Sequence, residues 1–403
     1  MLLWDYWPGP EGGAERQCRG LVRELSCRDI ETVVITSRFS FRSPSLELNG
    51  SAYIVRLGLL CPLALIASRL LTPVIRFCSA SNDKLYQDLS FWANLPFRWL
   101  ARLSFLCELR VRLWKNNFGV DLLHVHESTW LAGVGVWLTE KWQVPVACKI
   151  RNKGVLNAIG YDVPFRRVWY SLRPRSFFFA LNELTRDALI EKGVAADRIE
   201  VIPNGVDIPA EVPEHRTSNE VLYVGNFTQG ASHKGFDILL TAWAEVSKTL
   251  GKAELVMVGG GDASCWIGLT RQLGCFDSVR FVGSVDDPAP FFASAELFVL
   301  PSRHEGMSNA LLEAQSWGLP AVVSDIPANI VVVDDKVTGR VVPVEDPEAL
   351  AKGILGLLKD PRVRRAMGRA GRKKMKRSFS RQLVTDRYIE TYWRLVKEIN
   401  DCW

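Results

Sequence analysis

Apolar segments with the length of a strand alternate with segments of helical spacing over most of this chain. The alternation is clearest where the apolar run 295–301 leads through a loop to a predicted helix at 308–317 and a second apolar run at 321–325. A strand that reaches the next strand through a helix pairs with it in parallel. Gly318 and Pro320 follow the helix, as is usual at a helix C-terminus. Repeated units of this kind predict an α/β fold of doubly wound parallel sheets.

The α/β pattern occurs twice, and a polar, proline-containing stretch separates its two occurrences. We predict a first Rossmann-like domain over 1–207, a linker over 208–219 and a second Rossmann-like domain over 220–378. A helical tail at 379–403 is predicted to cross back to the first domain. Two domains joined in this way would face each other across a cleft, which is the usual place for a ligand.

Two carboxylates lie at the carboxyl end of the first apolar run described above. Glu305 is in the loop and Glu313 is on the helix that follows, at the sheet edge where ligands bind in open parallel sheets. The amides of Gly306, Met307 and Ser308 would lie at a helix N-terminus, which attracts phosphate. This combination predicts a nucleotide-sugar site, with Glu305 on sugar hydroxyls and Glu313 on a ribose diol. The alternative is a pair of ordinary helix-start acids stabilised by the macrodipole.

A Gly-Gly pair stands at the start of the first predicted helix, near 14–27. Gly12 and Gly13 would let the backbone approach a ligand closely at that helix N-terminus. Such a pair is also common in plain turns, so the signal is weak when taken alone.

Two histidines alternate near the end of a predicted strand over 120–127, so His124 and His126 share one face of it. His126 is nearer the carboxyl end of the strand and is the better candidate for a site. A structural histidine is the main alternative. A metal site would need further ligands, and the sequence offers none at a useful spacing.

Three segments carry an excess of basic residues. The segment 57–118 mixes arginines with Trp and Phe, as an interfacial helix on a membrane does, although ordinary helices packed on the sheet fit equally well. From 151 to 175 there are six basic residues, Arg151 and Lys153 first, against one acid, which fits either an anionic acceptor such as a lipid diphosphate or a solvated face. Between 359 and 381 there are eleven basic residues against one acid. Their helical spacing favours a solvated or membrane-facing surface over nucleic acid.

The net charge of +6 and the isoelectric point near 8.8 suit an anionic substrate or membrane surface. Nine cysteines without C-x-x-C spacing predict neither a zinc site nor a disulfide framework, and they fit a reducing compartment. Asp5 and Pro8 interrupt the first residues, so no signal peptide is predicted. The longest uncharged run, 57–68, is too short to span a bilayer. We therefore expect a protein that is cytoplasmic or peripheral on the inner face of the cytoplasmic membrane.

With Glu305 and Glu313 separated by seven residues after Pro301-Ser302, the chain resembles the retaining glycosyltransferases of family 4, which have the GT-B fold. The resemblance covers nearly the whole chain. Its other marks, in chain order, are Gly12-Gly13-Ala14-Glu15, VIPNGVD at 201–207, Lys234-Gly235-Phe236-Asp237, VGGGD at 258–262 and GLPAV at 318–322.

The resemblance implies transfer of a sugar from a nucleotide-sugar such as a UDP- or GDP-sugar, with retention at the anomeric carbon and with no metal or other cofactor. The acceptor would be a glycan or a lipid-linked sugar in cell-surface polysaccharide or glycolipid biosynthesis. Lys234 would neutralise the leaving diphosphate, Glu305 would hold the donor sugar, and His126 would lie by the sugar and the acceptor. Arg151 and Lys153 would also lie on the acceptor side. The implied donor-binding residues are Gly12, Gly13, Gly225, Asn226, Gly260, Arg303, Gly306, Met307, Ser308, Asn309, Leu312 and Glu313.

Two positions depart from the family pattern. Asn226 stands where family members usually carry an arginine, so Arg303 or His233 is the candidate for the second cation at the diphosphate. Asn329 stands where a glutamate is usual, which weakens one donor contact. The first strand, at 1–7, is shorter than is typical, which raises the question of a start codon farther upstream.

Three other functions fit parts of the sequence. A nucleotide-sugar 2-epimerase of related fold would use the donor site and turn over with no acceptor present. A non-catalytic glycan- or nucleotide-binding protein is disfavoured because Glu305, Glu313 and Lys234 occur together. A nicotinamide-dependent dehydrogenase is the weakest rival, since 259–261 lacks a G-x-G-x-x-G helix start. A nucleic-acid partner is not expected.

Overall fold

The computed structural model divides into two compact units. The first unit comprises Met1–Ile202 together with Thr385–Trp403, and the second comprises Pro203–Val384. Within the described part of the chain, no helix is both long and apolar enough to cross a membrane. The structure describes residues 1, 13–37, 40, 44–50, 52–58, 60–61, 100–111, 119–126, 134–135, 138, 142–150, 176–213, 216, 218–227 and 231–400.

The change from one unit to the other falls at residues 202–203, before the polar stretch 208–219. Within that stretch Arg216 donates from Nε to the carbonyl of Ala293 at 3.0 Å and from Nη2 to that of Trp317 at 2.7 Å. The described part of 208–219 therefore packs on the second unit.

The first unit is built on parallel strands. Residues with β-branched and aromatic side chains form β1 (Thr32–Ser37), β3 (Ala52–Leu57), β4 (Leu123–Val125), β5 (Val146–Ile150), β6 (Ser176–Ala180) and β7 (Ile199–Val201). Strands β4 to β7 lie side by side in chain order, all parallel. Strand β2 (Leu46–Asn49) differs, because it pairs antiparallel with β3.

The helices of the first unit include α1 (Gly13–Ser26), a helix at 100–111, α7 (Glu183–Glu191) and most of α15 (Arg381–Asn400). The Oδ1 atom of Asn182 accepts a hydrogen bond from the Thr185 amide at 2.9 Å and so caps α7. The long helix α15 is fixed to the edge of the sheet, where Arg387 Nη2 donates to the carbonyl of Val201 at 2.6 Å.

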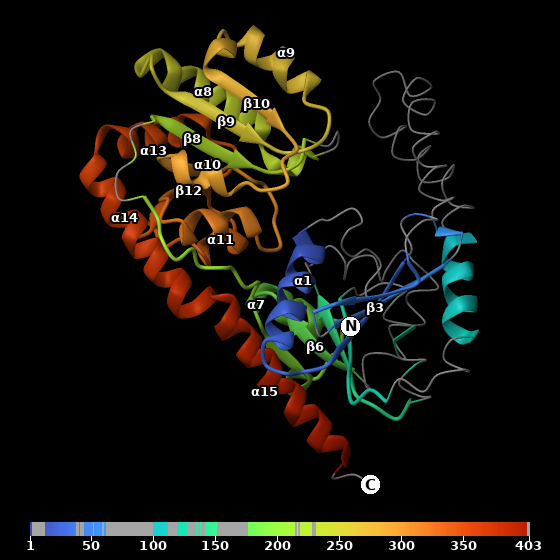
Figure 1. The fold of residues 1–403 in the computed structure, drawn as a ribbon. Helices are drawn as coiled ribbons and strands as arrows, with labels where there is room; N and C mark the ends of the chain where they lie inside the picture. The colour runs from blue at the N-terminus through green and yellow to red at the C-terminus, as the bar shows by residue number, and fades with distance from the viewer. Residues whose placement is uncertain are drawn as a thin grey trace. The chain divides into compact units, whose positions relative to one another are not determined.

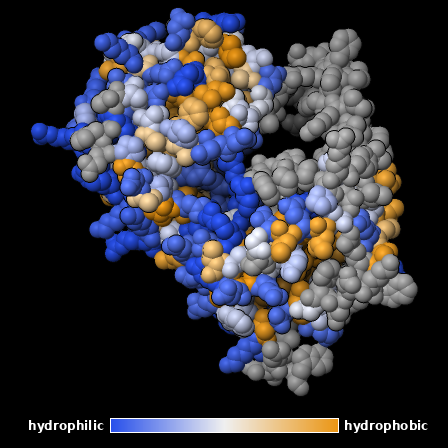
Figure 2. All heavy atoms as spheres, in the orientation of Figure 1, coloured by the Kyte–Doolittle hydropathy of each residue, from blue (hydrophilic) through white to orange (hydrophobic). Residues whose placement is uncertain are grey.

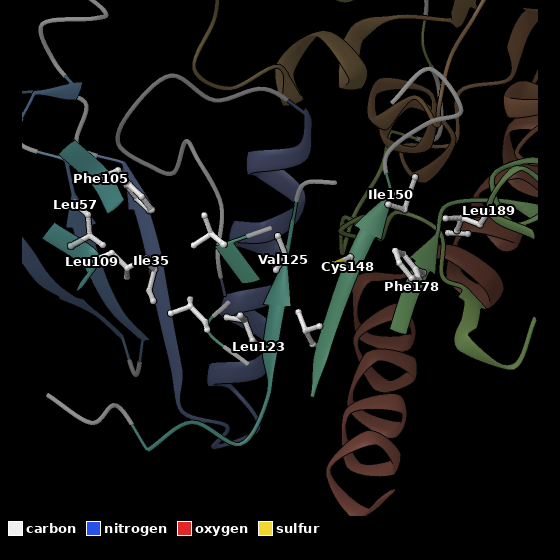
Figure 3. Close-up of a cluster of buried hydrophobic side chains, with 14 of the residues drawn as sticks. Ile35, Leu57, Phe105, Leu109, Leu123, Val125, Cys148, Ile150, Phe178 and Leu189 are labelled. Atoms are coloured by element: carbon white, nitrogen blue, oxygen red, sulfur yellow. The ribbon is translucent and has the colours of Figure 1, made fainter. Parts of the chain in front are cut away.

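Apolar side chains fill the space between the strands and helices of the first unit. Figure 3 shows Val125, Cys148 and Phe178 on the neighbouring strands β4, β5 and β6, with Leu189 of α7 beyond them. Burial of such side chains stabilises the fold by about 25 cal/mol per Å² of apolar surface removed from water. The core extends to Phe105 of the helix at 100–111, which is fully buried.

The second unit is a doubly wound parallel sheet, as the sequence predicts (Figure 1). Its strand order is β10-β9-β8-β11-β12-β13, so the chain starts at the centre, fills one side, and then returns to fill the other. All of its pairs are parallel. The strands are β8 (Glu220–Val224), β9 (Glu254–Val258), β10 (Val279–Gly283), β11 (Leu297–Leu300), β12 (Ala321–Ser324) and β13 (Gly339–Val342).

The helices of the second unit begin at residues that suit helix N-termini. Asp346 caps the first turn of α13 through its side chain, and Asp360 does so for α14, each followed by a proline. In the assembled unit α8 packs against α13, and α11 packs against α14. The helices are α8 (Phe236–Thr249), α9 (Ser264–Gln272), α10 (Ala289–Ser294), α11 (Asn309–Ser316), α12 (Pro327–Ile330), α13 (Pro347–Lys359) and α14 (Pro361–Lys374), which runs into a π-helical turn at Met375–Phe379.

Candidate functional site

The second unit brings two loops together at the centre of its sheet. β8 and β11 are neighbours, and from them the strand order runs outward in opposite directions. In doubly wound sheets, ligands bind at the carboxyl ends of the two strands where the order reverses. The loop after β8 carries Lys234, and the loop after β11 carries Glu305. The topology alone therefore places both residues at the position where a nucleotide is expected.

The backbones of these two loops touch at Gly235. This residue has a φ of +68°, and a Cβ atom added to it would lie only 2.2 Å from the carbonyl oxygen of Pro301. The amide of Arg303 also donates to the carbonyl of His233 at 2.7 Å. A residue without a side chain is required at this contact. The contact holds Lys234 next to the loop that carries Glu305.

Lys234 and Glu305 form an ion pair at this edge of the sheet. The Nζ atom of Lys234 lies 2.6 Å from Oε1 of Glu305, and the side chains are 23% and 12% exposed. Ser302 Oγ donates to the same carboxylate oxygen at 3.2 Å. Because both contacts use Oε1, the second oxygen, Oε2, accepts no hydrogen bond from the residues that the structure describes. Glu305 is thus held in place through one of its two carboxylate oxygens.

The N-terminus of α11 follows Glu305 and is fixed by side-chain contacts. Ser308 caps the helix, with its Oγ accepting from the Leu311 amide at 3.3 Å. Asn204 contacts the residues on both sides of Ser308, because its amide donates to Met307 Sδ at 3.3 Å and its Nδ2 donates to Asn309 Oδ1 at 2.9 Å. The positive end of the helix dipole is therefore fixed beside Glu305, where it favours an anion.

Glycine turns after β8 and β9 lie against each other at the same sheet edge. A Cβ atom on Gly259 would lie 1.9 Å from the carbonyl oxygen of Gly225. The Gly260 amide donates to Asn226 Oδ1 at 3.2 Å. The predicted donor-binding residues Gly225, Asn226 and Gly260 are thus neighbours, and the asparagine that replaces the family arginine joins the two turns.

Arg303 is held by two carboxylates. Its Nη1 and Nη2 atoms donate to the two oxygens of Asp237 at 2.9 and 2.7 Å, and its Nη2 also donates to Glu345 at 2.8 Å. These hydrogen bonds raise the pKa of Arg303 and lower the pKa of Asp237 and of Glu345. For Arg303 to serve as a second cation at a diphosphate, one of these pairs would have to open.

The other candidate cation, His233, lies in the short helical turn Ala231–Lys234 and is exposed. Partial desolvation and the charge of Lys234 lower its pKa, so His233 is neutral at pH 7. Asn329 is fully buried, and its Nδ2 donates to the carbonyl of Ser324 at 3.0 Å. Asn329 therefore secures the end of β12.

Glu313 and Leu312 lie on α11. Leu312 is fully buried in the core of the unit, so its side chain is not accessible to a ligand. Glu313 is half-buried, so its carboxylate is accessible. The loop that contains Glu305 leads directly into α11. A ligand bound by that loop would therefore lie within about two helical turns of Glu313.

His126 belongs to the first unit, just after β4, and is buried. Its ring stacks on that of His124, with centroids 4.1 Å apart. His124 Nδ1 is 2.5 Å from the hydroxyl of Tyr392 on α15. Burial, followed by the charges of His126 and Lys149, lowers the pKa of His124 well below its usual value, so this ring is neutral. The sequence places the pair on one face, and the structure adds α15 as the support behind it.

Of the other predicted site residues in the first unit, the structure describes only Gly13. Gly13 is the first residue of α1 and is exposed. Gly12, Arg151 and Lys153 lie outside the described residues. Much of the aromatic, basic segment 57–118 lies outside them as well.

Sequence reasoning did not single out four residues that support the site. Ser302 donates to Glu305, Asn204 orders the start of α11, and Asp237 and Glu345 hold Arg303. Ser302, Asn204 and Asp237 lie inside the family motifs at 301–302, 201–207 and 234–237. Glu345 lies outside them, and only the fold brings it to Arg303. Among the residues that the structure describes, no group of three or more His, Cys, Asp or Glu side chains could hold a metal ion.

Comparison with known proteins relates both units to glycosyltransferases. A family model described as Glycosyltransferase Family 4 matches residues 11–209, and one described as Glycosyl transferases group 1 matches residues 218–360. Phosphatidyl-myo-inositol mannosyltransferase of Mycolicibacterium smegmatis is 32% identical over 279 residues, which are 66% of this chain and 69% of the relative.

Solved structures show the same fold. Sucrose-phosphate synthase of Thermosynechococcus elongatus superposes with a TM-score of 0.74 at 22% identity, covering 98% of each chain. HepE of Anabaena in complex with UDP-glucose superposes with a TM-score of 0.66 at 16% identity, covering 98% of this chain and 99% of that one.

Proposed function

Because this chain belongs to the glycosyltransferases of family 4 and has their GT-B fold, we propose that it transfers a sugar from a nucleoside-diphosphate donor with retention of configuration and without a metal. The observation that carries the proposal is the Lys234–Glu305 ion pair at the centre of the doubly wound sheet. It sets a cation and a carboxylate side by side where a nucleotide is expected.

The chemistry of the proposed reaction needs stabilised negative charge on the leaving diphosphate. Lys234 would leave Glu305 for a diphosphate oxygen, and the N-terminus of α11 would add the N–H groups of Gly306 to Ser308. Fixed donors of this kind are usually the largest catalytic contribution, because they act where charge develops in the transition state. Their positive charge would do the work that a metal does in other transferases.

Glu305 is proposed to hold the donor sugar through hydroxyl groups. A carboxylate oxygen accepts hydrogen bonds from hydroxyls, and Oε2 faces no described donor, while Oε1 is anchored by Lys234 and Ser302. Glu313 is proposed to accept from the ribose. The sugar would pass through a transition state that resembles an oxocarbenium ion, as in glycoside hydrolysis.

The acceptor is proposed to be a glycan or a lipid-linked sugar bound by the first unit. His126, Arg151 and Lys153 are the proposed acceptor-side residues. The relative from Mycolicibacterium smegmatis is named for transfer of mannose to a phosphatidyl-inositol, which supports a lipid-linked acceptor and a place in glycolipid or surface-polysaccharide biosynthesis. HepE binds UDP-glucose, which supports a UDP-sugar as the first donor to test.

Contact with an anionic membrane is proposed for the basic side of α14 and its continuation. Five basic residues are spaced three or four positions apart, which places them on one helix face, and all five are exposed. None of them forms an ion pair with a carboxylate in the described part of the chain. Each basic group near an anionic surface contributes about 1 kcal/mol of attraction. The residues of this basic stripe are Arg362, Arg365, Arg369, Lys373 and Lys376.

The helix at 100–111 in the first unit also supports a membrane surface. Its outer side exposes Leu100, Leu103 and Val111, at 41%, 59% and 51%. Figure 2 shows hydrophobic atoms gathered over this helix. Apolar side chains that are buried in the membrane interface add a hydrophobic contribution to the electrostatic attraction between basic residues and anionic lipids.

Flotation with vesicles tests the membrane contact. The protein is expected to float with phosphatidylglycerol vesicles at low salt, and to float less well in high salt or with phosphatidylcholine. Reversing the charge of Arg362, Arg365 and Arg369 to Glu should reduce flotation. The same change in net charge at Lys248, Lys252 and Lys352, which lie elsewhere on the unit, is the matched control. Failure of the wild-type protein to float at low salt would contradict the proposal.

Thermal stabilisation by nucleotide-sugars tests the donor site. A panel of UDP-, GDP- and ADP-sugars is expected to contain at least one donor that raises the melting temperature, because a ligand that binds only the folded state stabilises it. Glu305→Ala and Lys234→Ala should abolish that shift. Lys352→Ala is the control, since Lys352 is exposed and paired with Glu348 on α13. If no nucleotide-sugar stabilises the protein, the transferase proposal fails.

A further inference from the structure

Tyr223 is a buried tyrosine whose hydroxyl has no hydrogen-bond partner among the described residues. It lies in β8 at 0% exposure, and its hydroxyl oxygen accepts and donates no hydrogen bond within the described part of the chain. A buried polar group without a partner costs free energy, and phenylalanine would fill the same space without that cost. The hydroxyl therefore calls for an explanation other than packing.

The hydroxyl points toward the sheet edge that carries the candidate site. Residues two apart along a strand share a face, and Gly225 directly follows β8 with its amide still bonded to Val258 of β9, so Tyr223 and Gly225 lie on the same side of the sheet. A Cβ atom on Gly225 would lie 2.5 Å from the Tyr223 hydroxyl oxygen. The phenol thus reaches along the strand to its carboxyl end, into the space that the absent side chain of Gly225 leaves.

The ring of Tyr223 is held from the side of the Lys234 loop. It packs edge-to-face on Phe236, with centroids 5.1 Å apart, and Phe236 is the first residue of α8. Phe236 comes two residues after Lys234. The tyrosine is therefore fixed beneath the loop that carries the catalytic cation of the proposed function.

The Glu305 loop lies beside the residues that surround this ring, because Phe236, which the Tyr223 ring contacts, comes two residues after Lys234, and Lys234 pairs with Glu305. Burial raises the pKa of Tyr223 above its usual range, and the negative charge of Glu305 raises it further. The phenol is therefore a neutral hydrogen-bond donor at physiological pH. A carboxylate is the acceptor with which a neutral phenol forms the stronger, charge-assisted type of hydrogen bond.

We propose that Tyr223 is a positioning residue that takes the place of Lys234 as the hydrogen-bond donor to Glu305 when the donor substrate is bound. In the unliganded protein, Lys234 occupies Oε1 of Glu305. When Lys234 turns to the diphosphate, that carboxylate loses its strongest partner just as it must hold the sugar. The Tyr223 hydroxyl then donates to Glu305 and keeps the carboxylate ionised and oriented. The inference rests on the proposed function, because it assumes a nucleotide-sugar at this site.

The test compares Tyr223→Phe with the wild-type protein in binding two ligands, a nucleotide-sugar and its nucleoside diphosphate without the sugar. Because Tyr223 acts through Glu305, which contacts only the sugar, the variant should lose about 10- to 100-fold of affinity for the nucleotide-sugar and keep its affinity for the diphosphate. The melting temperature of the unliganded variant should equal or exceed that of the wild type. Tyr388→Phe is the matched control, because Tyr388 is also buried and its hydroxyl also lacks a partner among the residues that the structure describes, but it lies on α15.

Double substitution separates positioning from packing. In a Glu305→Gln background, Tyr223→Phe should cause no further loss of nucleotide-sugar affinity, since the two residues act as one unit. The proposal would be overturned if Tyr223→Phe kept the wild-type affinity for both ligands, or if it lost the same factor of affinity for both. A wild-type protein that binds the diphosphate but no nucleotide-sugar would instead contradict the proposed function, so the two failures are distinguishable.

Discussion

Lys234 Nζ lies 2.6 Å from Glu305 Oε1, although the two residues are 71 positions apart in the chain. The strand order explains this proximity, because β8 and β11 are adjacent at the centre of the sheet and each residue follows one of them. A cation and a carboxylate are thereby paired in advance at the expected position of a diphosphate and its sugar.

Removal of the cation is expected to stop transfer. Lys234→Ala should lower the rate of sugar transfer about 100- to 1000-fold, because a fixed donor to the leaving group is lost. Lys234→Arg keeps the positive charge but replaces the ammonium by a larger, planar guanidinium, so its transfer rate should lie between those of the wild-type protein and Lys234→Ala. Initial rates of nucleoside-diphosphate release measure the effect, and an active Lys234→Ala protein would contradict the role given to this residue.

Glu313 is expected to accept hydrogen bonds from the ribose hydroxyls of the donor. The wild-type protein should bind a ribonucleoside diphosphate more tightly than the analogues that lack the 2′- or 3′-hydroxyl, and Glu313→Ala should lose that preference. A lost hydrogen bond to a charged group corresponds to about a tenfold or greater fall in affinity. Calorimetric titration with the paired ligands measures it. Equal discrimination in both proteins would remove Glu313 from the site.

Two glycines with different backbone conformations and surroundings test the contact between the site loops. Gly235→Ala should destabilise the protein by at least about 1–3 kcal/mol, because its φ of +68° and the Pro301 carbonyl at 2.2 Å leave no room for a Cβ atom. Gly268→Ala in α9 meets open space and should stabilise by about 0.5–1 kcal/mol. Urea denaturation of both variants measures the difference. A Gly235→Ala protein as stable as the wild type would contradict the loop contact.

The buried pair of histidines predicts a pH dependence of stability. The folded pKa of His124 is well below its unfolded value of 6.5, because the ring is buried and faces the charges of His126 and Lys149. Its neutral form therefore contributes stability above pH 6.5, and that stability is lost as the pH falls below 6.5, where the unfolded chain binds a proton that the folded protein does not. The slope for one such group is about 1.4 kcal/mol per pH unit.

Chemical unfolding between pH 7 and pH 5 measures this slope, and His124→Gln is the comparison. The free energy of unfolding of the variant should depend less steeply on pH in that window. The N-terminal amine of Met1, whose pKa burial lowers to about 6, is expected to add to the slope in both proteins. Identical slopes in the two proteins would show that His124 is not the group that titrates.

The strand and helix pattern was enough to predict the second unit, because its apolar runs are short and continuous and its helices have clear ends at residues such as Gly318 and Pro347. The family resemblance, read from the motifs around Lys234 and Glu305, is confirmed by the matches to family models. Sequence reasoning did not predict strand β2 and its antiparallel pairing with β3, because the strand is only four residues long and no buried apolar face marks it: Leu46 and Leu48 are both exposed.

The individual hydrogen bonds and ion pairs between residues far apart in the sequence could not be predicted. Arg303 was a candidate cation for the diphosphate, and only the folded chain reveals that Asp237 and Glu345 already hold it. Nothing in the sequence indicated a role for the Tyr223 hydroxyl, because a tyrosine in an apolar run is expected to be an ordinary core residue. That this hydroxyl has no partner among the described residues is visible only in the folded chain.

The configuration of the released or transferred sugar decides whether the protein is a retaining, metal-independent transferase. The donor that gives the largest thermal shift is incubated with the protein in EDTA, with and without a lipid-linked acceptor, and the anomeric proton of the product is followed by NMR from the first minutes. We predict sugar transfer without added metal, and an initial product with the anomeric configuration of the donor. An inverted product, a reaction abolished by EDTA, or a sugar epimerised at C2 with no acceptor present would contradict it.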